Sequence, residues 1–88
     1  MNKVASTLGN GVHVLGNCAV FLEKNIVDGS LKSNIVLEGP NNIENFVFQN
    51  QSSNARGEGI FLIHCENFTL QKNTITNNYN GIVSLTGV

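Results

Sequence analysis

The sequence predicts an all-β solenoid, a chain wound through about three to four short coils of parallel strands. A four-residue motif of small, β-branched, variable and aliphatic residue recurs at intervals of 23, 25 and 22 residues, more weakly in the fourth copy, which ends in Ser84. Apolar residues in and around the motifs alternate with period two, as in strands that bury one face. The segments between them are rich in Asn, Thr, Ser and Gly, which disfavour helix.

The repeat can be aligned from its strand motifs and from a second apolar pair in each unit. We expect the four motifs to stack as strands of one sheet: residues 11–14, 34–37, 59–62 and 81–84. Apolar residues five apart are expected to be equivalent in three units: Leu22 and Val27, Ile43 and Phe48, Leu70 and Ile75. In this alignment the surplus length is NQSSNARGEG, residues 50–59, which we expect to form a polar loop.

The alignment predicts a single module, residues 1–88, with full coils at about 11–33, 34–58 and 59–80 and partial coils at both ends. Val4 precedes Val12 by eight residues, as Val27 precedes Ile35, so part of a coil comes before the first full one. We therefore expect the chain to be a fragment of a longer solenoid, because terminal coils normally need polar caps.

Asparagine is expected to support the turns, because its amide satisfies turn backbone groups and can bond to an equivalent residue on the next coil. Asn50 and Asn77 follow Phe48 and Ile75 at the same offset, and they are the predicted rungs of an asparagine ladder. Asn25 and Asn73 also correspond, but the same alignment places Phe46 between them. We expect that second ladder to be broken.

The stretch GIFLIHCENFTLQKNTITNNYNGI, residues 59–82, resembles the right-handed parallel β-helix repeat of the pectate-lyase-like superfamily. In its Asn-rich form it is similar to the NosD-like repeat proteins. The resemblance covers roughly residues 11–85 and implies the fold rather than one chemistry, because the superfamily hosts lyases, hydrolases, adhesins and periplasmic proteins.

A leucine-rich repeat is the rival fold. Residues 68–75 satisfy its L-x-L-x-x-N-x-L core, and 22 residues lie within its period. That fold would place a helix or a similar convex segment after Ile75. Here TNNYNGIVSL offers turn residues and another strand pattern, which favours the β-helix.

Composition excludes several classes of function. Charged residues make up 12% of the chain and the formal net charge is −1, so no basic patch points to nucleic acid. No run approaches the roughly 18 apolar residues of a membrane span, and the first ten residues lack the core of a secretory signal. We expect an extracellular or periplasmic location if the chain is part of an exported parent.

No catalytic site is expected. The resemblance implies clustered acidic residues, and glycoside hydrolysis needs two carboxylates about 5–9.5 Å apart. The chain has one Asp and five Glu, and its weak catalytic candidates are Glu38 and Glu58 with Arg56 nearby. We interpret these three as solvated turn residues.

No metal site and no cofactor are expected either. His13 lies between two inward valines and so points outward, while His64 follows the strand motif at residues 59–62. Neither histidine has a partner at metal-ligand spacing. The two thiols, Cys18 and Cys65, fall near the same turn two coils apart, about 9.6 Å, which exceeds the reach of a disulfide. We predict two free thiols.

The predicted contact surface is the outer face of the motif sheet. If the first β-branched residue of each motif points inward, the outward rows are His13, Val36, Phe61 and Val83, then Leu15, Glu38, Ile63 and Leu85. Six of these eight are apolar, which favours self-association or packing against parent-chain segments. A polysaccharide platform is a further option, with Phe61 and Tyr79 as stacking rings. The candidate binding residues are Phe61, Val36, Val83, Ile63, Leu85 and His13.

Two functions fit the sequence. The first is a non-catalytic β-helix module of a larger or oligomeric surface or carbohydrate-recognising protein. The second is a fragment of a polysaccharide lyase or glycoside hydrolase whose catalytic residues lie largely outside this chain. The single Asp favours the first.

Overall fold

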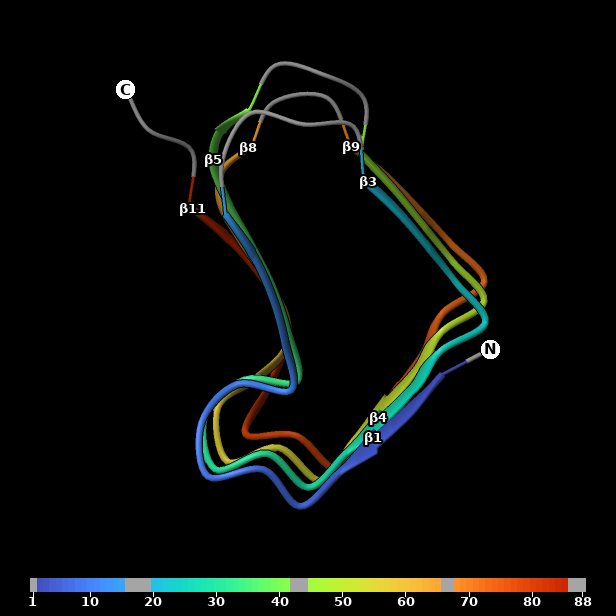
Figure 1. Ribbon diagram of the computed structural model, residues 1–88, viewed down its shortest axis with the longest axis vertical. Helices are drawn as coiled ribbons and strands as arrows, with labels where there is room; N and C mark the ends of the chain where they lie inside the picture. The colour runs from blue at the N-terminus through green and yellow to red at the C-terminus, as the bar shows by residue number, and fades with distance from the viewer. Residues whose placement is uncertain (1, 16–19, 42–44, 66–67, 86–88) are drawn as a thin grey trace.

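A computed structural model describes residues 2–15, 20–41, 45–65 and 68–85, and over these residues the chain is a parallel β-helix. Figure 1 looks along the stacked coils, whose straight sides superimpose as three sheets. The described residues form eleven strands and no helix, which confirms the predicted fold class and excludes the leucine-rich repeat. Within the described part, no helix is long and apolar enough to cross a membrane.

All strand pairs are parallel, and each sheet takes one strand from successive coils. Sheet A contains β1 (Lys3–Ala5), β4 (Ile26–Asp28), β7 (Gln51–Ser53) and β10 (Thr74–Thr76). Sheet B contains β2 (Val12–Leu15), β5 (Ile35–Asn41), β8 (Glu58–Cys65) and β11 (Asn80–Leu85). Sheet C contains β3 (Val20–Glu23), β6 (Asn45–Phe48) and β9 (Phe68–Gln71).

The core is a set of apolar columns that run along the stack. Its buried members come mainly from the two middle coils, because each of these has a coil on both sides: Val20, Val27, Ile35, Leu37, Val47, Ile60 and Leu62. Residues of the outer coils, such as Val4, Val12 and Ile75, pack against this core and are only partly buried. Burying one such aliphatic side chain stabilises the fold by about 1.5–3 kcal/mol.

The predicted register of sheet B is correct. Val12, Ile35, Ile60 and Ile82 pair across the four strands, as the motif alignment requires. Before the first motif, Val4 of β1 pairs with Val27 of β4.

The predicted register of the second coil in the other two sheets is wrong. Leu22 and Leu70 pair with Val47, not Ile43, and Val27 and Ile75 pair with Ser52, not Phe48. Ser52 occupies a core position with no exposed surface, and its hydroxyl donates to the Gly59 carbonyl at 2.9 Å. Because Ser52 is polar, a pattern of repeating apolar residues does not identify it as a core position.

The extra length of the second coil also lies elsewhere. Residues 50–59 are not a loop, because β7 lies within them and pairs on both sides in sheet A. The surplus falls between sheets B and C: Leu37 to Val47 is ten residues, whereas Val14 to Leu22 and Leu62 to Leu70 are eight. The register of β5 against β8 shifts there, between Glu38 and Asn41.

Two turns recur in each coil with the same backbone conformation. Between sheets A and B, a residue with positive φ occupies one equivalent position in all four coils: Ser6 (56°), Gly29 (77°), Asn54 (57°) and Asn77 (53°). Between sheets C and A, the equivalent position is held by Lys24 (56°), Gln49 (55°) and Lys72 (55°). Gly and Asn tolerate this conformation best, which explains their frequency in the first set.

An asparagine ladder is present, but its members differ from those predicted. It runs directly after the second turn and consists of Asn2, Asn25, Asn50 and Asn73. The backbone and side-chain amides of Asn25 donate to Oδ1 of Asn50 at 2.9 and 3.0 Å, and those of Asn50 donate to Asn73 at 2.9 and 3.1 Å. Asn77 lies in the other turn. The error follows from the wrong register of the second coil, which placed Phe46 where Asn50 belongs.

Candidate functional site

The predicted contact surface on sheet B has the expected register. His13, Val36, Phe61 and Val83 pair across the sheet, and so do Leu15, Glu38, Ile63 and Leu85. The side chains of Val83 and Leu85 lie outside what the structure describes. Leu15 is 64% exposed and Phe61 and Ile63 are half-buried.

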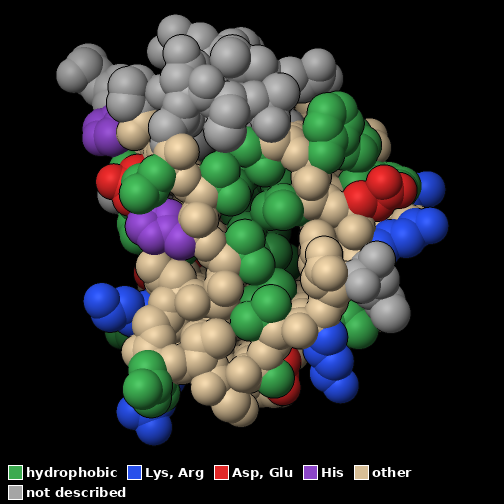
Figure 2. Space-filling model, viewed as in Figure 1, with side chains coloured by type: hydrophobic (Ala, Val, Ile, Leu, Met, Phe, Trp, Pro, Cys, Tyr) green, Lys and Arg blue, Asp and Glu red, His purple; other side chains and the backbone are tan. Residues whose placement is uncertain are grey.

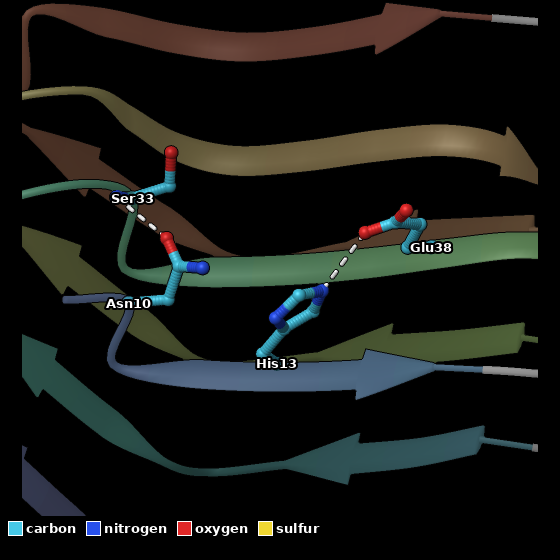
Figure 3. A network of polar contacts seen from close by, with 4 residues as sticks. All are labelled: Asn10, His13, Ser33 and Glu38. Carbon is cyan, nitrogen blue, oxygen red and sulfur yellow. Dashed lines mark hydrogen bonds and ion pairs between the residues drawn. The ribbon is translucent and has the colours of Figure 1, made fainter.

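Val36, the centre of the predicted patch, offers almost no surface. It points away from the core, because Ile35 and Leu37 point inward, yet only 3% of it is exposed. Beside it, His13 Nε2 and Glu38 Oε1 lie 3.0 Å apart and connect β2 to β5 (Figure 3). Both side chains of this contact are more than a third exposed, so it adds at most about 1 kcal/mol.

The structure does not bring the candidate acids together. Glu38 pairs with Ile63, which lies five residues beyond Glu58 along β8, so the two glutamates are separated by roughly 16 Å at the strand rise. Inverting and retaining glycosidases need about 5–9.5 Å. Arg56 is exposed and lies in the turn between sheets A and B, where its backbone N–H donates to the Ser30 carbonyl.

Glu58 instead belongs to a polar ladder at the start of sheet B, formed by Asn10, Ser33, Glu58 and Asn80. Ser33 Oγ donates to Oε1 of Glu58 at 2.7 Å, and Asn80 Nδ2 donates to its Oε2 at 3.2 Å. Below them, the Ser33 backbone N–H donates to Asn10 Oδ1 at 3.1 Å (Figure 3). The hydrogen bond from Ser33 is the main cause that lowers the pKa of Glu58. Burial raises this pKa, and the hydrogen bond from Asn80 lowers it further. Glu58 is therefore held as a carboxylate in a structural role.

The exposed aromatic surface lies on another sheet. Leu22, Val47 and Leu70 point into the core from sheet C, so their neighbours in sequence face outward. Three of these neighbours are Phe21, Phe46 and Phe48, which we call the aromatic strip. The rings of Phe21 and Phe46 are 5.8 Å apart between centroids, and those of Phe46 and Phe48 are 5.5 Å apart with an interplanar angle of 28°. Phe21 is 70% exposed.

Polar side chains border the aromatic strip in register. Glu23 and Gln71 flank Phe48 across sheet C, and Thr69 continues the row of Phe21 and Phe46. All three are exposed, and Lys72 places Nζ 5.9 Å from the Phe48 centroid. The face thus combines apolar ring surfaces with a carboxylate, an amide, a hydroxyl and an ammonium group. Such a mixture of apolar surface and convergent hydrogen-bonding groups is typical of ligand sites.

Sequence reasoning missed the aromatic strip for an identifiable reason. Phe46 and Phe48 were aligned as parts of the turn and core because the second coil was out of register. The sequence signal that could have found it is the alternation within VFLE and NFVF, residues 20–23 and 45–48. The β-branched residue of each segment, Val20 or Val47, points inward, so the phenylalanines beside it point outward. The other proposed stacking residue, Tyr79, is 81% exposed in the turn between β10 and β11, outside sheet C and the aromatic strip.

The predicted thiol state stays a prediction. Cys18 lies outside the described residues. The backbone of Cys65 pairs with Asn41, but its side chain is also outside the described part.

Residues 1–86 match the sequence model of a family described as periplasmic copper-binding protein (NosD). Searches of curated proteins and of solved structures gave no match.

The described side chains do not fit a copper site. Copper in proteins is held by His, Cys and Met ligands, usually three or more. Over the described residues, no three His, Cys, Asp or Glu side chains come together. His13 contacts Glu38, and His64 lies two coils away and three residues further along the sheet, exposed near the end of β8 with φ of 55°.

The family match covers nearly the whole chain, and the stacked parallel strands agree with the fold that the resemblance implies. The protein therefore belongs to the NosD family.

Proposed function

We propose that this chain is a non-catalytic β-helix recognition module of a periplasmic protein, and that it binds polysaccharide on the outer face of sheet C. The observation that carries the proposal is the aromatic strip, three contiguous phenylalanine rings that the core does not require. Large apolar side chains clustered on a surface normally mark a contact.

The chemistry of the strip suits a sugar. A pyranose ring has an apolar C–H face and a rim of hydroxyl groups. The rings of Phe46 and Phe48 supply a surface against which the C–H face can pack and lose contact with water. Glu23, Gln71 and Thr69 lie beside the rings, where carboxylate, amide and hydroxyl groups can exchange hydrogen bonds with the rim.

The arrangement supports binding without cleavage. The candidate acids are too far apart for paired acid catalysis, and Glu58 is engaged by Ser33 and Asn80. The alternative, part of a lyase or hydrolase, would require catalytic groups supplied from outside these residues, and no observation favours it. The compartment is proposed from the family description, which names the periplasm.

Binding can be tested by affinity electrophoresis of the purified chain in gels that contain neutral or acidic polysaccharides. We expect retardation by at least one polysaccharide and a loss of affinity of about tenfold or more in Phe46→Ala, because a buried aromatic contact is commonly worth over 1.4 kcal/mol. No sugar ends should be released during incubation.

The matched control is Phe61→Ala, which removes the same side chain from the outer face of sheet B. We expect this variant to bind as the unaltered chain does. Retardation that is lost in Phe61→Ala and kept in Phe46→Ala would move the site to sheet B. Absence of retardation by every polysaccharide would refute the proposal.

A further inference from the structure

The turns that lead from sheet A to sheet B carry a row of exposed side chains, one from each coil. Backbone hydrogen bonds set the register of this row. In the second, third and fourth coils, the N–H of its member donates to the carbonyl just before the equivalent residue of the preceding coil, at 3.1, 3.0 and 3.2 Å. The members therefore follow one another at the sheet spacing of about 4.8 Å, and we call them the corner ridge: Leu8, Leu31, Arg56 and Tyr79.

The corner ridge stands out from the molecule. Leu8 and Tyr79 are 86% and 81% exposed, and Leu31, which has a coil on each side, is still 43% exposed. The preceding residues in the two middle coils, Ser30 and Ala55, are buried, so the turn directs the ridge residues outward. In Figure 1 these turns project from the corner between the two sheets. At the same corner, at the lower left of Figure 2, hydrophobic side chains protrude beside Lys or Arg side chains.

Two cations accompany the apolar side chains of the ridge. Arg56 is a member of it, and Lys32 follows Leu31 directly. Both are exposed, and neither forms an ion pair with a residue that the structure describes. The nearby carboxylates of Asp28 and Glu58 each accept two hydrogen bonds from side chains of sheet A or of the start of sheet B. The two cations of this corner are therefore available to an external anion.

The shape of the ridge decides between two kinds of partner. It is one residue wide, convex and about 14 Å long, whereas a stable protein interface uses about 20–30 residues from each side. A membrane surface requires less, because a few apolar side chains can enter the boundary between head groups and acyl chains. Tyrosine is enriched at this boundary, and Lys and Arg are attracted to anionic head groups. The combination of side chains on the ridge fits the membrane surface.

We propose that the corner ridge binds the chain to the surface of an anionic lipid membrane. Leu8 and Leu31 enter the boundary between head groups and acyl chains, and Tyr79 lies at the level of the head groups. Arg56 and Lys32 contact lipid phosphates, which the planar guanidinium can bind with two hydrogen bonds. Sheet C lies on the opposite side of the coil in Figure 1, so the aromatic strip faces away from the membrane. The proposal is independent of the polysaccharide site.

Co-sedimentation with lipid vesicles tests the proposal. We expect the chain to bind vesicles of phosphatidylglycerol and phosphatidylcholine in equal parts, and to bind phosphatidylcholine vesicles more weakly. Leu8→Ser and Leu31→Ser should each lower the affinity for the mixed vesicles by about tenfold, because each removes a leucine from an apolar environment. Lys32→Gln/Arg56→Gln should lower the same affinity by about 25-fold, at roughly fivefold for each cation, and leave binding to phosphatidylcholine unchanged.

Matched controls separate the ridge from general attraction. Lys3→Gln/Lys24→Gln removes the same charge from the other end of sheet A, and Phe61→Ala removes an apolar side chain from sheet B. Both variants should bind the mixed vesicles as the unaltered chain does, and circular dichroism should show every variant folded.

Three results would each overturn the proposal. The first is that the unaltered chain binds neither kind of vesicle. The second is that Leu8→Ser binds as the unaltered chain does, or that Lys3→Gln/Lys24→Gln loses as much affinity as the variant of the ridge cations. The third is self-association, seen by sedimentation velocity without lipid, that Leu8→Ser abolishes, since the ridge would then be a contact between copies of the chain.

Discussion

The turn that follows strands β3, β6 and β9 and the outer face of those strands differ in how strongly the fold restricts their residues. At the turn after these strands, the residues that follow Lys24, Gln49 and Lys72 are all asparagine, because the turn presents the same backbone groups in every coil. On the outer face of the strands, equivalent positions hold Phe21, Phe46 and Thr69. The turn constrains the side chain and the outer face does not, so the outer face is free to carry function.

The largest expected effect is at the asparagine ladder. Asn50 is fully buried, accepts from Asn25 and donates to Asn73 and to the Leu22 carbonyl. Asn50→Ala leaves several of these groups without partners, at about 1–3 kcal/mol each, so we expect the free energy of unfolding to fall by about 3 kcal/mol or more. Urea denaturation followed by circular dichroism measures it.

The matched control is Asn2→Ala, at the exposed first rung. The side chain of Asn2 makes one hydrogen bond, from Nδ2 to Oδ1 of Asn25, so we expect a loss below about 1 kcal/mol. Equal losses of unfolding free energy in Asn2→Ala and Asn50→Ala would mean that the contribution of a ladder asparagine does not depend on its burial.

Two adjacent residues of β6 compare the stability contributions of the inner and outer faces of sheet C. Val47 is fully buried and Phe46 faces outward. We expect Val47→Ala to cost about 2 kcal/mol and Phe46→Ala about 1 kcal/mol or less, although Phe46 loses the larger side chain. The reverse order in thermal or urea unfolding would place Phe46 in the core and remove the case for the aromatic strip.

The smallest expected effect is at Glu58. Its pKa is lowered in the folded chain, chiefly by Ser33, so its contribution is present above the pKa of an unfolded glutamate and is lost as the pH falls through the folded value. We expect Glu58→Gln to reduce stability at neutral pH by no more than about 1 kcal/mol, given partial exposure, and by less in acid. A deficit that is constant from neutral to acid pH would show that the charge of Glu58 does not matter.

Sheet B could be predicted from the sequence because the first inward residue of its motif is aliphatic in every coil. Val12, Ile35, Ile60 and Ile82 repeat without exception, and their pairing was predicted correctly. Strong local patterns of this kind identify a strand and its register together.

Sheets A and C could not be aligned correctly through the second coil. Ser52 takes a core position that holds Val27 and Ile75 in the neighbouring coils, while Phe46 and Phe48 are apolar but point outward. Hydrophobicity alone therefore favoured the wrong alignment by four residues. The asparagine ladder and the aromatic strip were both lost through this single shift, because both are defined by register.

The most direct test of the proposed function is to map the ligand site by NMR. Titration of the isotope-labelled chain with oligosaccharides from a polysaccharide that retards it should shift the ring resonances of Phe21, Phe46 and Phe48 and the side-chain amide of Gln71. The resonances of Phe61 and Ile63 should not move. Shifts confined to sheet B, or none at saturating oligosaccharide, would contradict a binding site on the outer face of sheet C.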